Sequence, residues 1–209
     1  MMNERVKLIE EYLEELYPDA FCELEFNNDY ELLMAVVMSA QTTDKRVNQV
    51  TRILFKKYDT LEKLKDAELN DLENIIRPIG TYHKKALFIK EIATVLVECY
   101  NSEMPKERAI LEKLPGVGRK TVNVVLSVLY NYPAIAVDTH VERVSKRLGL
   151  VKPNDSVYEV EMKLQKRFKK ENWSKRHHQL IFFGRYHCKA KNPECAYCKL
   201  SCICKYKGK

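Results

Sequence analysis

The residues with the clearest chemistry are four cysteines near the C-terminal end of the chain. Cys188, Cys195, Cys198 and Cys204 follow the spacing C-x6-C-x2-C-x5-C, and five of the seven cysteines lie in the last 22 residues. Thiolates at such spacing bind soft metals or iron–sulfur clusters. The alternative is a set of disulfides, which form in oxidising compartments. Because the charged start, residues 1–10, has no apolar signal segment and the cysteine total is odd, the metal interpretation is favoured.

The spacing also separates two kinds of metal site. Structural zinc sites use two close ligand pairs, with about two to four residues within each pair. Only Cys195 and Cys198 form such a pair, which favours a [4Fe–4S] cluster. Cys202 stays open as an alternative to Cys204 for the fourth ligand. Lysines lie between and after the cysteines and indicate a polyanionic partner; they are Lys189, Lys191, Lys199 and Lys205.

A second motif is the segment LPGVGRKT, residues 114–121, which joins two helical patterns. Pro115 and Gly116 should end the first helix, and Gly118 should allow a tight turn. Val117, between the two glycines, is expected to place an apolar side chain in the turn. The free N–H groups at the start of the next helix bind phosphate without reading base sequence. We therefore favour a phosphate-binding turn over a purely structural one.

Two residues near this turn could carry catalysis. Lys120 lies on the first turn of an otherwise apolar helix. A helix N-terminus disfavours a cation and partial burial lowers a lysine's pKa, so both favour the neutral amine that attacks a carbon electrophile. A lysine that only contacts phosphate fits this position equally well. Asp138 opens the helical run 136–141 and is either an N-cap or a carboxylate that assists proton transfer or stabilises developing positive charge.

Charge and composition agree with a globular protein that binds an anionic partner. The net charge is +7, and residues 162–209 hold fourteen Lys or Arg against only Glu171 and Glu194. The N-terminal stretch is acidic. This asymmetry is typical of nucleic-acid binding, although a solvated charged face is the alternative. No apolar stretch approaches the roughly 18 residues that span a bilayer.

The elements that must position these residues are all helical. Apolar residues recur at a spacing of three to four, and no segment shows sustained alternation. We expect helices over about 6–16, 32–39, 47–54, 82–100, 137–148, 156–168 and 173–186. Residues 61–76 should form two short helices broken near Asn70, and two further helices should end near Leu114 and start near Gly118. The best domain boundary lies at Asn131-Tyr132-Pro133. We expect a domain over 22–132 and a discontinuous one over 1–21 and 133–209, although the pattern alone does not place the first helix.

The combination of motifs resembles one family. LPGVGRKT, then Asp138 in VDTH 18 residues after Lys120, then the four-cysteine motif are together similar to the bacterial endonuclease III family of the helix–hairpin–helix superfamily. The similarity covers essentially the whole chain. It implies an all-α DNA glycosylase fold in which two helical domains flank a DNA-binding cleft and a C-terminal loop, 188–204, holds a [4Fe–4S] cluster.

The resemblance also implies roles for individual residues. Lys120 would be the nucleophile of a bifunctional DNA N-glycosylase and apurinic-site lyase that removes oxidised pyrimidines, with Asp138 as the essential aspartate. The four cysteines would be cluster ligands. The DNA contacts implied or proposed on this basis are Gln41, Ile79, Thr81, Pro115, Gly116, Val117, Gly118, Arg119, Thr121, Lys189 and Lys191.

Access to a base in duplex DNA requires that the nucleotide be flipped out. The segment SAQTTD, residues 39–44, resembles the family loop whose Gln41 fills the vacated stack, while a polar helix connector is the alternative. A second insertion loop maps to 79–82. Because Thr81 is small and polar where relatives can carry a bulky apolar wedge, Ile79 or Tyr82 would share the task of opening the stack.

Two other readings remain at this point. A related helix–hairpin–helix glycosylase for mismatched thymine or pyrimidine dimers differs only in its pocket loops. A non-catalytic DNA-binding module would have no use for Lys120 and Asp138 together. The expected partner is damaged or abasic double-stranded DNA, and we expect a monomer in the bacterial cytoplasm, at the nucleoid, with no membrane association.

Overall fold

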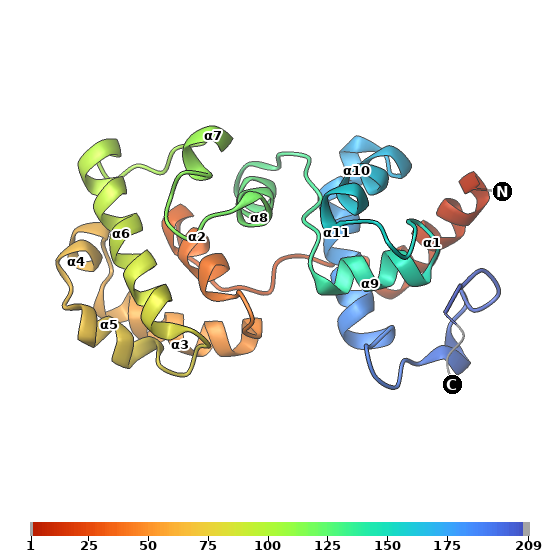
Figure 1. The fold of residues 1–209 in the computed structure, drawn as a ribbon, viewed down its shortest axis with the longest axis horizontal. Coiled ribbons are helices and arrows are strands. Elements are labelled where there is room, and N and C mark those ends of the chain that lie inside the picture. The colour runs from red at the N-terminus through yellow and green to blue at the C-terminus, as the bar shows by residue number, and fades with distance from the viewer. Residues whose placement is uncertain (1, 207–209) are drawn as a thin grey trace. The chain divides into compact units, whose positions relative to one another are not determined.

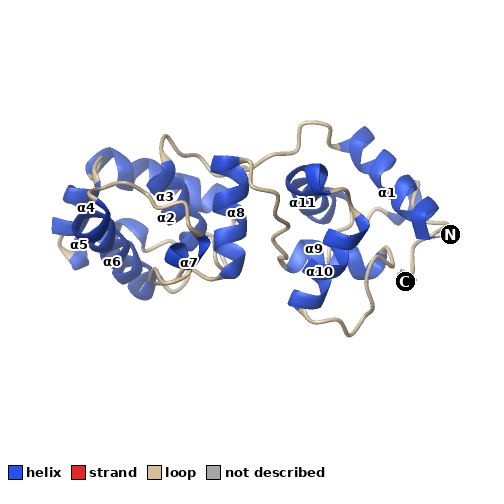
Figure 2. Cartoon of the chain, turned by 90° about the horizontal axis from the view of Figure 1, so that it is seen from above, coloured by secondary structure: helices blue, strands red, loops and turns tan. Residues whose placement is uncertain are grey.

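The structure is a computed structural model that describes residues 2–206. Within that range the chain contains helices and helical turns and no strand, which confirms the all-α expectation (Figure 2). The chain folds as two compact units. Unit 1 combines Met1–Cys22 with Tyr130–Lys209, and unit 2 is Glu23–Leu129. The sequence placed these divisions at 22 and 132.

Unit 2 is built on apolar helices with polar caps. Asn28 caps α2, Thr43 caps α3 and Thr60 caps α4, and the side chain of each accepts the backbone N–H of the third residue of its helix. The helix α2 is buried along its length, and α4 and α5 pack on α6. The elements are α2 (Asp29–Met38), α3 (Asp44–Lys57), α4 (Leu61–Asp66), α5 (Leu69–Ile76), α6 (Tyr82–Tyr100), α7 (Arg108–Leu111) and α8 (Arg119–Tyr130).

Unit 1 surrounds a second apolar core to which both ends of the chain contribute. Val6, Ile9 and Leu13 of α1 pack with residues that follow position 134 in the sequence, and Figure 1 shows red α1 beside the blue C-terminal helices. The elements are α1 (Met2–Leu16), α9 (Thr139–Arg147), α10 (Val157–Arg167), the 3-10 turn η1 (Lys170–Asn172), α11 (Trp173–Phe182), the π-helical turn η2 (Phe183–His187) and the 3-10 turn η3 (Cys195–Tyr197).

Several expected boundaries differ from the observed ones. The break between α4 and α5 lies at residues 67–68, whereas Asn70 is inside α5. The helix expected from Val137 begins at Thr139, because Asp138 is its cap. The helix expected over 173–186 ends at Phe182 and widens into the π-helical turn that leads to Cys188. Among the described residues, no helix is long and apolar enough to cross a membrane.

Candidate active site and metal-binding pocket

The turn between α7 and α8 is held by packing inside unit 2. Val117 is buried and its N–H donates to the Leu114 carbonyl at 3.1 Å. Gly116 has φ +72°, and a Cβ there would lie 2.3 Å from the ring of Phe88. The sequence assigned the tight turn to Gly118, and this was wrong, because Gly118 has no positive φ and nothing lies within 4 Å of its Cβ position. The turn therefore requires a glycine at position 116. At position 118 the space that a Cβ would occupy is open, at the start of α8.

Lys120 is the second residue of α8, and its side chain is exposed. The partial burial expected from the sequence is therefore wrong. The helix itself is fixed less than one turn further along, where Arg108 of α7 donates to the Oδ1 of the buried Asn123 at 2.7 Å. Arg108 also pairs with Glu112 at 3.1 Å. These contacts hold the start of α8 while Lys120 stays accessible.

Asp138 in unit 1 caps α9. Its Oδ1 accepts the N–H groups of His140 at 2.9 Å and Val141 at 2.8 Å. The N-cap interpretation is thus confirmed. A carboxylate held in this way has its orientation fixed by the helix, and it is half-buried. The proton-transfer role stays a prediction.

Two exposed loop tips in unit 2 adopt the left-handed conformation. Gln41 and Thr81 both have φ 57°, which is uncommon for residues other than glycine and especially for a β-branched one. Such backbone strain is frequently found at functional sites. The two loops lie side by side, since a Cβ on Gly80 would be 3.8 Å from the Gln41 carbonyl oxygen. Ile79 is 1% exposed, so the expectation that it reaches into a base stack is wrong for this conformation.

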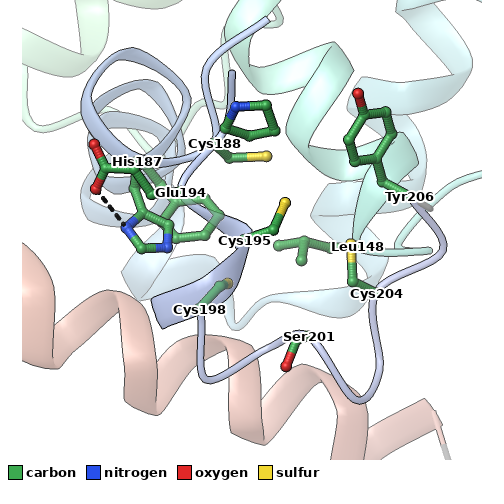
Figure 3. Close-up of a pocket in the computed structure, with 11 residues that line it drawn as sticks. Leu148, His187, Cys188, Glu194, Cys195, Cys198, Ser201, Cys204 and Tyr206 are labelled. Atoms are coloured by element: carbon green, nitrogen blue, oxygen red, sulfur yellow. Dashed lines mark ion pairs between the residues drawn. The ribbon is translucent and has the colours of Figure 1, made fainter. Parts of the chain in front are cut away.

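The four motif cysteines line one pocket in unit 1. Figure 3 shows Cys188, Cys195 and Cys204 directed toward a common hollow, with Cys198 beside them. Cys202 does not line this pocket and is exposed, with its Sγ 3.9 Å from the Lys199 carbonyl. The geometry therefore favours Cys204 over Cys202 as the fourth member of the set.

The donor set can be tested against the expected cofactor. Within residues 2–206, no three His, Cys, Asp or Glu side chains come together closely enough to hold one metal ion. Four thiols around a shared hollow instead fit a larger group, such as a cluster, which needs soft thiolate ligands. Burial raises the pKa of the thiols of Cys198 and Cys204, so these thiols are protonated unless a cation binds them.

Sequence reasoning missed the residue that organises this pocket. Arg147, the last residue of α9, donates to the Lys189 carbonyl at 2.8 Å and lies 3.4 Å from Cys188 Sγ. Its own carbonyl accepts the Lys205 N–H at 2.7 Å, and its guanidinium stacks 3.8 Å from the Tyr206 ring centroid. Arg147 thus joins both ends of the cysteine loop. The only sequence signal was a basic residue in the last turn of a helix.

The lysines of the cysteine loop differ in their partners. Lys189 forms an ion pair with Glu194 at 2.7 Å, and Lys199 pairs with Glu15 of α1 at 2.5 Å. Lys191 is exposed, and no ion pair of Lys191 occurs among the residues described. The sequence treated the acidic start and the basic end as opposite halves. Both belong to unit 1, and glutamates of α1 neutralise part of the C-terminal positive charge.

Comparison with known proteins agrees with this geometry. Residues 34–170 match the family model of the HhH-GPD superfamily base excision DNA repair proteins. Because this match covers more than half of the 209 residues, the chain belongs to that superfamily.

Relatives narrow the assignment. Endonuclease III of Bacillus subtilis (strain 168) is 52% identical over 91% of this chain and 87% of its own length. Endonuclease III of Escherichia coli (strain K12) is 42% identical over 94% of this chain and 93% of its own. A solved structure of a trapped endonuclease III–DNA covalent intermediate is 51% identical, with a TM-score of 0.94, and covers 98% of this chain and 96% of its own. Within the superfamily, the chain is a member of the endonuclease III family and hence a base excision repair DNA glycosylase and apurinic-site lyase.

Proposed function

We propose that this enzyme removes oxidised pyrimidines from duplex DNA through a Schiff base on Lys120 and then cleaves the abasic site on its 3′ side. The observation that carries the proposal is an exposed lysine at the start of α8, directly after a turn fixed by Gly116 and Val117. The trapped covalent intermediate of a relative with DNA supports covalent chemistry. Thymine glycol is the representative substrate.

The chemistry begins with the neutral amine of Lys120. Its Nζ forms a bond to C1′ of the damaged nucleotide, and the bond between C1′ and the base breaks, with the base leaving with the bonding electron pair and taking up the proton that Nζ then loses. Loss of a proton from Nζ and opening of the sugar give the Schiff base. Removal of a C2′ proton then allows the C3′–O bond to break, which releases the 3′ phosphate. The strand is nicked by β-elimination.

Asp138 assists this sequence. Oδ1 is committed to the cap of α9, so the second carboxylate oxygen is the one proposed to accept a proton or stabilise positive charge on the sugar. A fixed carboxylate needs little reorganisation when charge develops.

DNA binding is assigned to the turn, to the two strained loop tips and to the cysteine loop. The amide N–H groups that follow Gly118 would donate hydrogen bonds to a phosphate, which the open space beside Gly118 permits. Gln41 would fill the space left by the flipped nucleotide, with Thr81 beside it. Lys189 and Lys191 would contact phosphate, of which Lys191 is the less committed to protein partners. The remaining proposed contacts are Pro115, Arg119 and Thr121.

The cofactor is a [4Fe–4S] cluster held by Cys188, Cys195, Cys198 and Cys204. When bound, the cluster supplies four metal–thiolate bonds that fix the shape of a loop whose own apolar packing is small. The substrate is damaged or abasic double-stranded DNA. The enzyme acts as a monomer on chromosomal DNA in the bacterial cytoplasm.

The proposal is tested by borohydride trapping on duplexes that contain thymine glycol or an abasic site. The wild type should form a covalent adduct on both, whereas Lys120→Gln should form none while binding retains its affinity. Lys113→Gln, an exposed lysine on the preceding segment, is the matched control and should trap normally.

The outcomes separate the candidate functions. Adduct on abasic DNA but not on thymine glycol would keep the lyase and overturn the proposed base, which favours a related glycosylase for mismatched thymine or pyrimidine dimers. No adduct from the wild type on either duplex would overturn the Schiff-base mechanism. Trapping by Lys120→Gln at the wild-type rate would move the nucleophile to another amine.

A further inference from the structure

One buried cation in unit 2 has no part in the chemistry above. Lys85, on the first turn of α6, is 4% exposed. Its Nζ donates to the Met38 carbonyl at 2.9 Å and to the Ala40 carbonyl at 2.6 Å, and it lies 3.4 Å from Thr42 Oγ1. No ion pair of Lys85 occurs among the described residues. A cation buried without a carboxylate is costly unless polar groups surround it.

The three acceptors explain how this lysine is tolerated. An ammonium has three N–H donors, and three oxygen atoms face it here. Met38 is the last residue of α2, where the unpaired carbonyls carry partial negative charge and favour a cation. Lys85 therefore acts as a C-terminal cap for a different helix from its own.

The position of these acceptors matters more than their number. Ala40 and Thr42 directly precede and follow Gln41 in the sequence. The Lys85 ammonium therefore contacts the loop on both sides of its strained tip. Lys85 is also four residues after Thr81, whose carbonyl accepts the Lys85 N–H at 3.1 Å. One residue thus connects the backbone around Gln41 to the backbone of Thr81.

We propose that Lys85 is a positioning residue that holds the Gln41 and Thr81 loop tips as one fixed pair, so that both can enter the DNA stack together when a nucleotide flips out. The inference rests on the proposed function of these two tips. Loss of the ammonium would remove contacts on both sides of Gln41 that offset the free-energy cost of its φ of 57°, and would leave the hydrogen bond from the Thr42 N–H to the Ser39 carbonyl to hold the turn. The tips would then need to be ordered during DNA binding, which slows flipping.

The test compares substrates that do and do not require a stack to be opened. Single-turnover rates are measured on duplex DNA with thymine glycol or an abasic site, and on a single-stranded abasic oligonucleotide. For Lys85→Met we expect a loss of about tenfold to a hundredfold on both duplexes, from the contribution of hydrogen bonds to a charged group. The rate on the single strand should stay within about twofold of wild type.

A matched control exists on the same helix. Lys90, five residues further along α6, also donates to a backbone carbonyl, that of Ala67, which belongs to neither tip. Lys90→Met should cost stability in the same way and leave the ratio of duplex to single-strand rates unchanged. Thr42→Val removes one of the three acceptors with little change in side-chain shape, and it should lower the duplex rate by a smaller factor than Lys85→Met. If Lys85→Met does not fold, the Thr42→Val variant tests the proposal.

Three results would overturn the inference: an equal loss on duplex and single strand, no loss on either, or the same change of ratio in Lys90→Met. Failure of the proposed function is distinguishable from these. In that case the wild-type enzyme itself would cleave neither abasic substrate.

Discussion

The turn that precedes α8 and the loop that holds the four cysteines are both proposed to contact DNA phosphate, yet they are held in different ways. The turn is fixed by apolar packing within unit 2, through buried Val117 and the contact of Gly116 with Phe88. In the cysteine loop, Leu200 and Cys188 are buried, whereas Tyr197 is 86% exposed. Arg147 supplies much of the remaining support through hydrogen bonds.

This difference indicates how much each region depends on a bound group. The turn needs only the rest of its unit to take its shape. The loop has four thiols directed around a hollow and few apolar contacts, so its shape should depend on what the thiols bind. The first prediction tests that dependence, and it carries the largest expected effect.

Cys198→Ala should lose iron and the visible absorption of the cluster, while Cys202→Ala should keep both, because Cys202 does not line the pocket. We expect unit 1 to lose more than about 4 kcal/mol of stability, the range seen when a metal site is removed. Iron content and limited proteolysis measure this, and new cleavage should fall in residues 188–206. Normal iron in Cys198→Ala, or iron loss in Cys202→Ala, would contradict the ligand assignment.

The second prediction concerns the two glycines of the turn. Gly116→Ala places a Cβ against Phe88 at a positive φ and should cost about 1–3 kcal/mol of unit 2 stability. Gly118→Ala should change stability by no more than about 0.5 kcal/mol, since its Cβ meets nothing. The Gly118→Ala variant should bind DNA more weakly, because the added methyl group lies where the phosphate would approach.

Thermal unfolding and fluorescence anisotropy on an abasic-analogue duplex measure these two effects separately. Equal stability loss in the two variants would contradict the assignment of the strained position to Gly116. Unchanged affinity in Gly118→Ala would remove the phosphate from this turn.

The smallest expected effect concerns the charges of α1. Glu14 hydrogen-bonds Lys175 and Gln179, and chiefly the Lys175 ammonium lowers its pKa to about 2. A lowered carboxyl pKa contributes stability above the unfolded value, near 4.3, that is lost as pH falls toward 2. Because the side chain is 43% exposed, solvent screens the pair and we expect less than about 1 kcal/mol.

Glu14→Gln should therefore be less stable than wild type at pH 7, and the gap should narrow below about pH 4. Trp173, the single tryptophan, lies in unit 1 and reports urea unfolding there. Glu11→Gln, on the same helix and 3.8 Å from Lys7, is the control. A gap that does not change with pH would show that packing, not charge, holds α1.

Local signals explain which parts of this fold could be predicted. The expected bounds of α6, 82–100, agree with the structure because Pro78 and Gly80 interrupt the chain before it and Asn101 ends it in the left-handed conformation. The break before α5 was misplaced because Asn70 is a poor helix former that an exposed first turn tolerates. From the sequence alone, the low helix propensity of Asn70 could not be weighed against the burial of Leu72, which stabilises the helix.

The features of the candidate site also differ in whether the sequence could predict them. The cysteine spacing and the turn could be located from the sequence, since both are short motifs. The strained glycine could not be identified, because its reason is a ring, Phe88, 28 positions away. Lys85 had one overlooked signal: it lies on the same helical face as the buried Ile89, Ile92 and Leu96, where a cation is unexpected.

The discontinuity of unit 1 has a consequence for how the enzyme is made. The apolar face of α1 leaves the ribosome first, but its partners in the core begin at Ile135 and extend to Leu200. At about 5–20 residues per second, α1 must wait roughly 10–40 seconds for that core, while unit 2 can already fold. Chaperones should therefore meet an exposed N-terminal helix on nascent chains, and the proposed cluster could bind only after Cys204 has been synthesised.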